Sequence, residues 1–168
     1  MIPDVTAERA NSLRYIYVND RADHDYSTEA EPLPKSHGAT HIGKFLAWVA
    51  LHGLVNDYHE QQSTELLGKL RRREITGQQF FTAACREQFA EKDLNVEGNA
   101  FAGHYYRNEA GKRGTYFVDY KKVLAHGLPS FWHVADTWDN YDKLAAVIDQ
   151  RFKEWKNPSR KRWWQFWK

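Results

Sequence analysis

The last apolar pattern of the chain constrains the fold most, because its period fits a helix and not a strand. Large apolar residues recur every three or four positions, at Trp138, Tyr141, Ala145, Ile148, Phe152 and Trp155. This spacing places them on one face of a helix, with polar residues on much of the remaining surface. Asp136 or Thr137 precedes the pattern and is suited to cap the first turn. The sequence therefore predicts an amphipathic helix that packs by one side against a core.

Further helical patterns lie upstream and cover, in chain order, residues 40–53, 64–73, 76–89, 99–106 and 116–124. Thr40 is the expected N-cap of the first helix, whose apolar surface is broad enough to predict a central position. Thr76 and Gln79 match the capping-box pattern and start the third helix.

The pattern of residues 116–124 is ambiguous. Tyr116, Val118 and Tyr120 alternate as in a strand, but a helix accommodates more of the large residues of this segment. We therefore expect a helix that ends before Pro129, followed by a short extended piece over 131–134.

These patterns predict a mainly α fold, a compact single-domain helical bundle of about five to six helices. At 168 residues the chain is long enough for one domain with its own hydrophobic core. Residues 1–36 are expected to form an irregular N-terminal segment with one short β element over 15–18. The helical domain is expected over 37–157, and residues 158–168 form a basic aromatic tail.

Cysteine content and hydropathy favour a cytoplasmic location. Cys85 is the only cysteine, so no disulfide can form within the chain, and its apolar surroundings predict a small buried group. The N-terminus lacks a basic start followed by an apolar run, and no window has the length needed to cross a bilayer. We therefore expect no membrane span.

The charge is distributed unevenly along the chain. The net charge is +2, but residues 151–168 carry +6, so the rest of the chain carries −4. A protein that binds nucleic acid through its folded body needs a basic face there. The charge distribution therefore does not favour a stable nucleic-acid complex.

Histidines and aspartates supply the candidates for chemistry. His41, His133, Asp119 and Asp136 would form an alternative metal or acid-base site if the fold brought them together, with His104 as a further candidate. None of them has the spacing of a known metal motif, and capping or core roles explain them better. The primary prediction is therefore no catalytic residue, no metal and no cofactor.

The C-terminal tail combines cations with Trp163, Trp164, Phe166 and Trp167. Such a composition fits a weak membrane-interface contact, stacking on single-stranded nucleic acid, or docking on the body or on a neighbouring subunit. The segment is too short for stable membrane anchoring by itself, which favours docking.

Four blocks of the sequence resemble a bacterial family of small cytoplasmic domains grouped with polymorphic-toxin immunity proteins. The blocks cover residues 38–48, 94–102 with 105–106, 119–120 and 128–141. The resemblance implies a compact, mainly helical domain, often encoded near type VI secretion effectors, with no established catalytic residues.

The resemblance leads to the hypothesis of a protein that neutralises a cognate antibacterial toxin by occlusion, as a monomer or homodimer. Tyrosine anchors and acidic side chains in the N-terminal segment are suited to grip a basic partner. The candidate contacts are Tyr15, Tyr17, Asp20, Asp23, Asp25, Tyr26, Glu29 and Glu31. Two alternatives stay open: a small metal-dependent hydrolase that uses the His/Asp cluster, and a peripheral membrane or nucleic-acid adaptor that acts through the tail.

Overall fold

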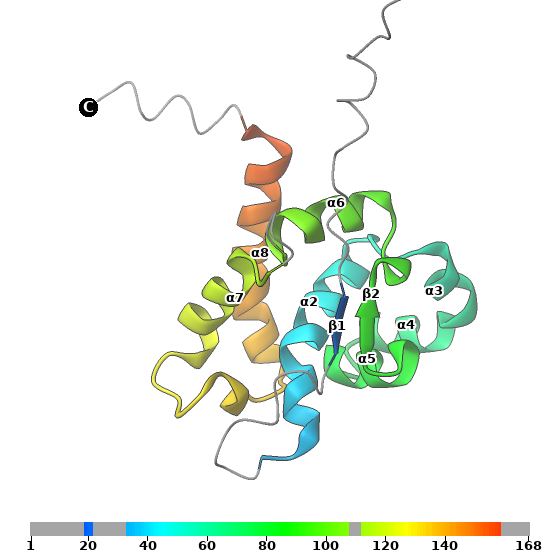
Figure 1. The fold of residues 1–168 in the computed structure, drawn as a ribbon. Helices are drawn as coiled ribbons and strands as arrows, with labels where there is room; N and C mark the ends of the chain where they lie inside the picture. The colour runs from blue at the N-terminus through cyan, green and yellow to red at the C-terminus, as the bar shows by residue number, and fades with distance from the viewer. Residues whose placement is uncertain (1–18, 22–32, 108–111, 159–168) are drawn as a thin grey trace, which may run out of the picture.

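The computed structural model describes residues 19–21, 33–107 and 112–158, which form a mainly helical fold with a two-stranded sheet (Figure 1). The α-helices are α2 (Thr40–Leu51), α3 (Asp57–Gln62), α4 (Thr64–Arg71), α5 (Gly77–Cys85), α6 (Val96–Tyr105), α7 (Thr115–Tyr120) and α8 (Trp138–Lys156). Shorter helical elements are the 3-10 helices η2 (Lys35–Ala39), η3 (Glu91–Asp93) and η5 (Phe131–His133), and the π-helix η4 (Lys121–Ala125). The strands β1 (Asn19–Arg21) and β2 (Gln88–Ala90) are antiparallel, with Asp20 opposite Phe89.

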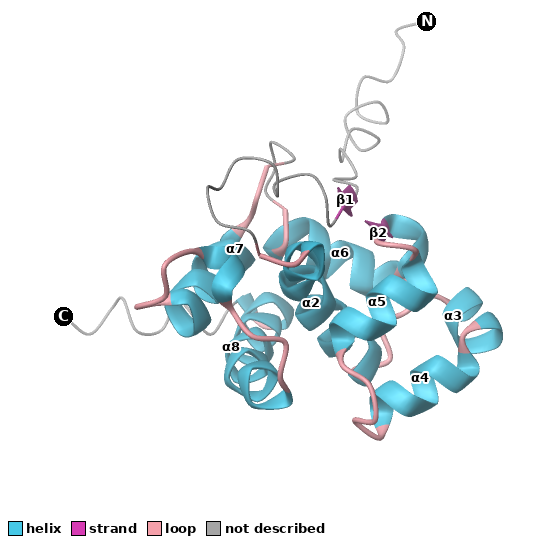
Figure 2. Cartoon of the chain, turned by 90° about the horizontal axis from the view of Figure 1, so that it is seen from below, coloured by secondary structure: helices cyan, strands magenta, loops and turns pink. Residues whose placement is uncertain are grey.

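Helix α2 lies at the centre of the fold. Helices α7 and α8 lie on one side of it and α3, α4 and α5 on the other, in both views (Figures 1 and 2). Every residue from Thr40 to Ala50 is buried, which confirms the central position predicted from its broad apolar surface. The core is therefore arranged around this helix on all sides.

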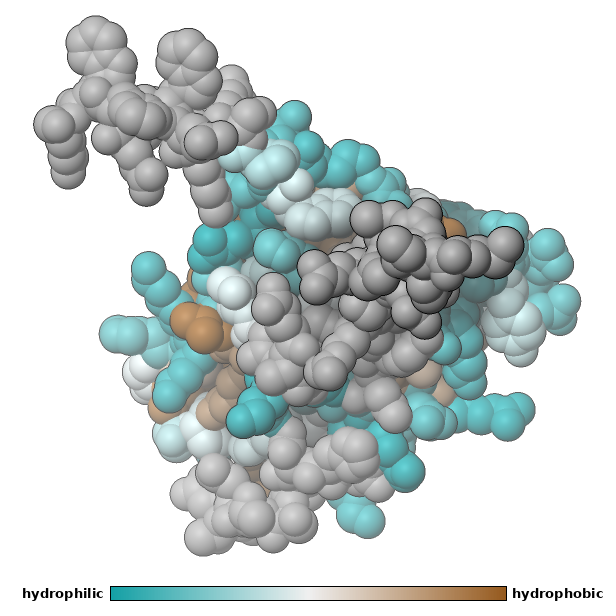
Figure 3. Space-filling model, turned by 45° about the horizontal axis from the view of Figure 1, so that its top comes forward, coloured by the Kyte–Doolittle hydropathy of each residue, from teal (hydrophilic) through white to brown (hydrophobic). Residues whose placement is uncertain are grey.

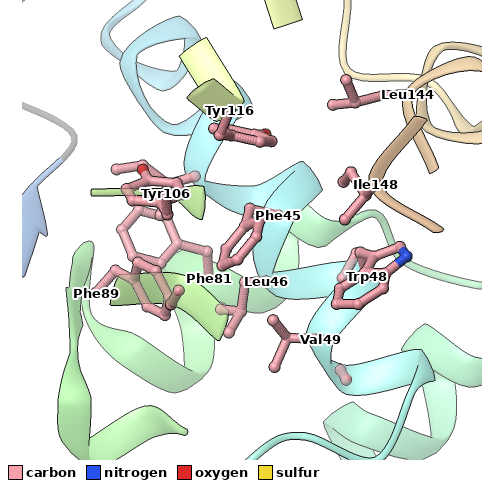
Figure 4. Packing of buried hydrophobic residues seen from close by; sticks show 14 of the residues in the cluster. Phe45, Leu46, Trp48, Val49, Phe81, Phe89, Tyr106, Tyr116, Leu144 and Ile148 are labelled. Carbon is pink, nitrogen blue, oxygen red and sulfur yellow. The ribbon is translucent and has the colours of Figure 1, made fainter. Parts of the chain in front are cut away.

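The core is rich in aromatic rings that contact α2. Phe45 points toward Tyr106 and Tyr116, and Trp48 faces Ile148, a residue of α8 (Figure 4). The ring centroids of Phe45 and Tyr106 are 4.8 Å apart, and those of Phe45 and Tyr116 are 5.1 Å apart. These separations are typical of favourable aromatic pairs.

Two glycines allow α2 and α5 to pack closely. A Cβ atom at Gly77 would overlap the backbone carbonyl of Gly43, and a Cβ atom at Gly43 would overlap the backbone at Gly77 and Gln78. The first turn of α5 therefore touches α2 backbone to backbone. Thr76 and Gln79 form the predicted capping box at this point.

Helix α8 confirms the pattern from which it was predicted. Tyr141, Leu144 and Ile148 are buried, and Thr137 caps the helix by accepting a 3.2 Å hydrogen bond from the backbone N–H of Asn140. Trp48 fixes the helix to α2, because its indole N–H donates to Asp149 at 2.8 Å.

Four local features differ from the predictions. The helix predicted over 76–89 ends earlier, as α5 at Cys85, because Arg86 takes a left-handed conformation and residues 88–90 pair with β1 as strand β2. Thr40 is not an N-cap, because the 3-10 helix η2 runs directly into α2 and Ala39 occupies the cap position without a side-chain bond. Residues 131–134 are not extended, since Ser130 caps a 3-10 turn over 131–133 through the backbone N–H of Trp132. Helix α3 was not predicted; Asn56 caps it locally.

The helix preferred for residues 116–124 is present as α7 and its continuation η4. The strand expected over 15–18 lies outside the described residues, and β1 follows it immediately.

Candidate functional site

His41 is buried inside an aromatic cage near the start of α2. Its imidazole Nε2 lies 3.5 Å from the carboxylate of Asp20. The cage is formed by rings whose centroids lie 5.3–6.3 Å from the imidazole, those of Phe117, Tyr120, Phe131 and Trp132. This environment closes the imidazole off from solvent.

The other three residues of the predicted His/Asp cluster have partners of their own. Asp119 accepts hydrogen bonds from Tyr105 and Arg151. Asp136 accepts from the hydroxyl of Thr76 and lies 3.6 Å from the buried ammonium of Lys44. The ring Nδ1 of His133 is 2.9 Å from the hydroxyl of Ser130. These residues and His41 are not among the described groups close enough to share a metal ion.

Of the N-terminal contact candidates, only Asp20 belongs to the described residues. It is 5% exposed and accepts a 2.6 Å hydrogen bond from the hydroxyl of Tyr106. Burial alone raises the pKa of Asp20, but His41, Tyr106 and Arg107 outweigh it and hold this pKa below its usual value. Asp20 is thus an internal ionic partner in this structure. The remaining candidates, Tyr15, Tyr17, Asp23, Asp25, Tyr26, Glu29 and Glu31, lie outside the described residues.

The structure brings together a different set, His59, Cys85 and Asp93. His59 Nε2 lies 2.9 Å from Asp93 Oδ1 and 3.9 Å from Cys85 Sγ. All three residues are buried, and burial raises the pKa of the Cys85 thiol strongly, with a further contribution from the negative charge of Asp93. The prediction of a buried Cys85 is confirmed. Its partners were missed, because His59 lies 26 positions upstream in a helix that the sequence pattern did not reveal.

A cationic surface lies on the outer side of α7 and η4. Val118 is 65% exposed, and Lys121 and Lys122, which lie three and four residues further along the helix, are also exposed. Leu128, 40% exposed, follows the end of η4. We call Val118, Lys121, Lys122 and Leu128 the α7 face. Figure 3 shows apolar atoms bordered by hydrophilic side chains on this side of the molecule.

The exposed charges of the segment that carries the α7 face have one sign. Within the described residues 112–134, the exposed charged side chains are Lys112, Arg113, Lys121 and Lys122, and the single carboxylate, Asp119, is buried and bound to Arg151. Cationic side chains next to exposed apolar ones attract an acidic surface.

Stacked rings support the α7 face from below. Phe117 and Phe131 stack with centroids 6.3 Å apart, and the guanidinium of Arg113 lies 4.9 Å from the centre of the Phe117 ring. Tyr120 packs against Phe131 at 4.5 Å. Such packing holds the backbone of α7 in one conformation before any partner binds.

A small hollow opens between α6, α7 and the end of α8. Its volume is about 270 Å³, and it is lined by His104, Tyr105, Thr115, Arg151, Glu154, Trp155 and Pro158. The guanidinium of Arg151 is already bound to Asp119 and lies 3.7 Å from Glu154. These two carboxylates already balance the charge of Arg151, so the hollow presents no unpaired positive charge from this residue to a ligand.

Two predictions concern membranes, one about spanning helices and one about the aromatic tail, and the described residues bear only on the first. None of the described helices combines the length and apolar character needed to cross a bilayer. The aromatic tail from residue 159 onward lies outside the described residues, so its predicted contacts stay predictions.

Comparison with known proteins places the chain in a family. A family model described as a domain of unknown function (DUF7832) matches residues 17–134, which include every described element from β1 to η5. No curated protein and no solved structure matches the chain. Helix α8 lies beyond the matched residues, although it is packed into the core through Trp48 and Asp149. Because the match covers more than half of the 168-residue chain, the protein belongs to the DUF7832 family.

Proposed function

We propose that this protein neutralises a cognate antibacterial toxin by binding to it and covering its working surface, as an immunity protein does. The proposal rests on the sequence blocks that resemble immunity proteins and on the α7 face. The observation that carries it is the exposure of Val118 among cationic side chains, without an exposed acid in the described residues 112–134.

The shape and charge of the α7 face favour a protein partner with an acidic rim around an apolar patch. An exposed apolar side chain gains free energy when a partner removes it from water, and surrounding charges accelerate the encounter and fix its orientation. The rings of Phe117 and Phe131 keep this surface in place, so little conformational entropy is lost on binding. The acidic N-terminal candidates other than the buried Asp20 would contact a basic region of the partner, and they form a second, separate part of the proposal.

Co-expression tests the proposed function. A reading frame that neighbours this gene and encodes a toxin-like protein is sought and expressed with and without the protein, and growth, gel filtration and titration calorimetry are recorded. We expect the protein to restore growth and to elute with the toxin. Failure of the wild-type protein to protect against that neighbour would reject neutralisation.

A charge-reversal variant tests the α7 face. Val118→Asp combined with Lys121→Glu and Lys122→Glu is expected to weaken the complex by about 100-fold or more, because an apolar contact is lost and two attractions become repulsions. The control is Lys143→Glu with Lys153→Glu, two exposed lysines of α8. Equal protection by both variants, with unchanged circular dichroism, would exclude this face. Binding of a single-stranded oligonucleotide by the wild-type protein alone would instead favour the adaptor function.

A further inference from the structure

We propose that His59, Cys85 and Asp93 form a binding site for a divalent cation of the zinc class. One ligand atom from each residue lies within 4.8 Å of the other two, and all three side chains are buried. The residues come from three elements, α3, the last residue of α5 and the last residue of η3. The site is independent of the α7 face and of the proposed toxin.

Two of the three distances between the ligand atoms are close to those of a tetrahedral site. Bond lengths of about 2.0–2.3 Å to oxygen, nitrogen and sulfur place neighbouring ligand atoms about 3.3–3.6 Å apart. The structure has 2.9 Å between His59 Nε2 and Asp93 Oδ1, and 3.9 Å between His59 Nε2 and Cys85 Sγ. These two separations lie within a few tenths of an ångström of the tetrahedral values, and the ligand atoms of Cys85 and Asp93, which lie within 4.8 Å of each other, would approach on binding.

The chemistry of the three ligands selects the ion. A thiolate, an imidazole and a carboxylate together suit zinc and the similar ion Co²⁺. Mg²⁺ and Ca²⁺ prefer sites made of oxygen atoms, so a sulfur ligand disfavours them. When the cation binds, the Cys85 thiol releases its proton to solvent, the imidazole of His59 keeps one proton on Nδ1, and the lone pairs of Sγ and Nε2 form the bonds to the metal. A water molecule would complete a fourth position.

Neighbouring groups already hold two of the ligands in orientations suited to a metal. Asp93 Oδ2 accepts a 2.8 Å hydrogen bond from the backbone N–H of Ala90, which directs Oδ1 toward His59. On the other side of the imidazole, Nδ1 lies 3.3 Å from the hydroxyl of Ser63. Such outer contacts orient ligands in known metal sites.

The backbone around Asp93 is also fixed. The N–H of Asn56 donates to the carbonyl of Asp93 at 3.0 Å, and Val55 and Leu94 form an isolated β-bridge. Segment 91–95 is thereby held against the residues that lead into α3. The ring of Phe80, 5.8 Å from that of His59, adds an apolar wall that limits access of water.

Cobalt spectroscopy of the full-length, untagged chain tests the proposal. After treatment with a chelator, the protein is titrated with Co²⁺ alone, and we expect a thiolate-to-cobalt charge-transfer band together with intense visible bands of tetrahedral Co²⁺. Because Cys85 is the only cysteine, a thiolate band can come from no other residue of the chain. Absence of this band in the folded wild-type protein would overturn the proposal.

Zinc binding by matched variants provides the second measurement. Cys85→Ala and His59→Gln are expected to lower the affinity for Zn²⁺ by about 100-fold and to remove the rise in melting temperature that Zn²⁺ gives the wild-type protein. His104→Gln, an exposed histidine of α6, is the control and should behave as the wild type. If His59→Gln does not fold, Cys85→Ala and Asp93→Asn decide the question. An equal rise in melting temperature in Cys85→Ala would place the ion elsewhere and overturn the site.

Discussion

Arg151 on α8 holds Asp119 on α7 through two hydrogen bonds, 2.8 Å from Nε to Oδ2 and 3.0 Å from Nη2 to Oδ1. The hydroxyl of Tyr105 donates a third bond to the same carboxylate at 3.0 Å. Asp119 is buried, so these bonds join α6, α7 and α8 under partial exclusion of water. Asp119 was predicted as a metal or acid-base candidate, and its position instead gives it a role in joining helices.

Removal of this carboxylate should destabilise the fold. We expect Asp119→Ala to lower the free energy of unfolding by about 2–3 kcal/mol, because it leaves Arg151 and the Tyr105 hydroxyl without their acceptor. Asp142→Ala is the matched control. Asp142 accepts two equally short bonds from Arg73, but both side chains are about half exposed, so we expect a loss below about 1 kcal/mol. If urea denaturation shows that both variants lose a similar free energy of unfolding, burial does not explain the contribution of Asp119.

The contact between α2 and α5 leaves no room for a methyl group. Gly77→Ala should cost about 3 kcal/mol, since the added Cβ would overlap the carbonyl of Gly43 and push the two helices apart. Gly68→Ala in α4 is the control, because its Cβ would meet only the end of the Arg72 side chain. This change should be neutral or stabilise the helix by up to about 1 kcal/mol. The denaturant midpoint measures both, and a Gly77→Ala protein as stable as wild type would refute the close contact.

Asp20 should contribute to loss of stability in acid. The folded state keeps its pKa below the ordinary value of 3.8, so the unfolded chain takes up the proton first as the pH falls. The contribution is fully present above about pH 4 and is lost as the pH falls through the folded-state pKa. Asp20→Asn should therefore unfold with a shallower pH dependence below pH 4. The difference from wild type should persist at 1 M salt because the carboxylate is buried, and its disappearance there would contradict this origin.

The connection from α5 to β2 carries unfavourable backbone angles. Arg86 and Glu87 both have positive φ, 52° and 60°, a conformation that costs a residue with a side chain about 1–2 kcal/mol. Arg86→Gly removes this cost but gives the unfolded chain more freedom, so we expect a net gain of about 0.5–1 kcal/mol. Lys143→Gly inside α8 should lose about 1 kcal/mol. Thermal unfolding compares the two variants. A lower stability of Arg86→Gly than of the wild type would show that the Arg86 side chain contributes more free energy than the strain costs.

Local signals account for the elements that were predicted correctly. The capping box of Thr76 and Gln79 and the apolar period of 138–155 each lie within one helix, so neighbouring residues contain the whole signal. The prediction at Thr40 was wrong because a polar residue before an apolar run marks a cap only where the preceding backbone is extended. Here the preceding residues 35–39 are already helical.

The sequence by itself determined the mainly helical class, the central position of the helix that begins at Thr40, and the burial of Cys85, because these follow from apolar content and period over short windows. Only the tertiary structure decided which charged groups meet. Asp20 reaches Tyr106 across 86 positions, and Arg151 reaches Asp119 across 32. His59 reaches Asp93 across 34 positions. Such pairs depend on how the helices and strands pack, and no short window of sequence contains both partners.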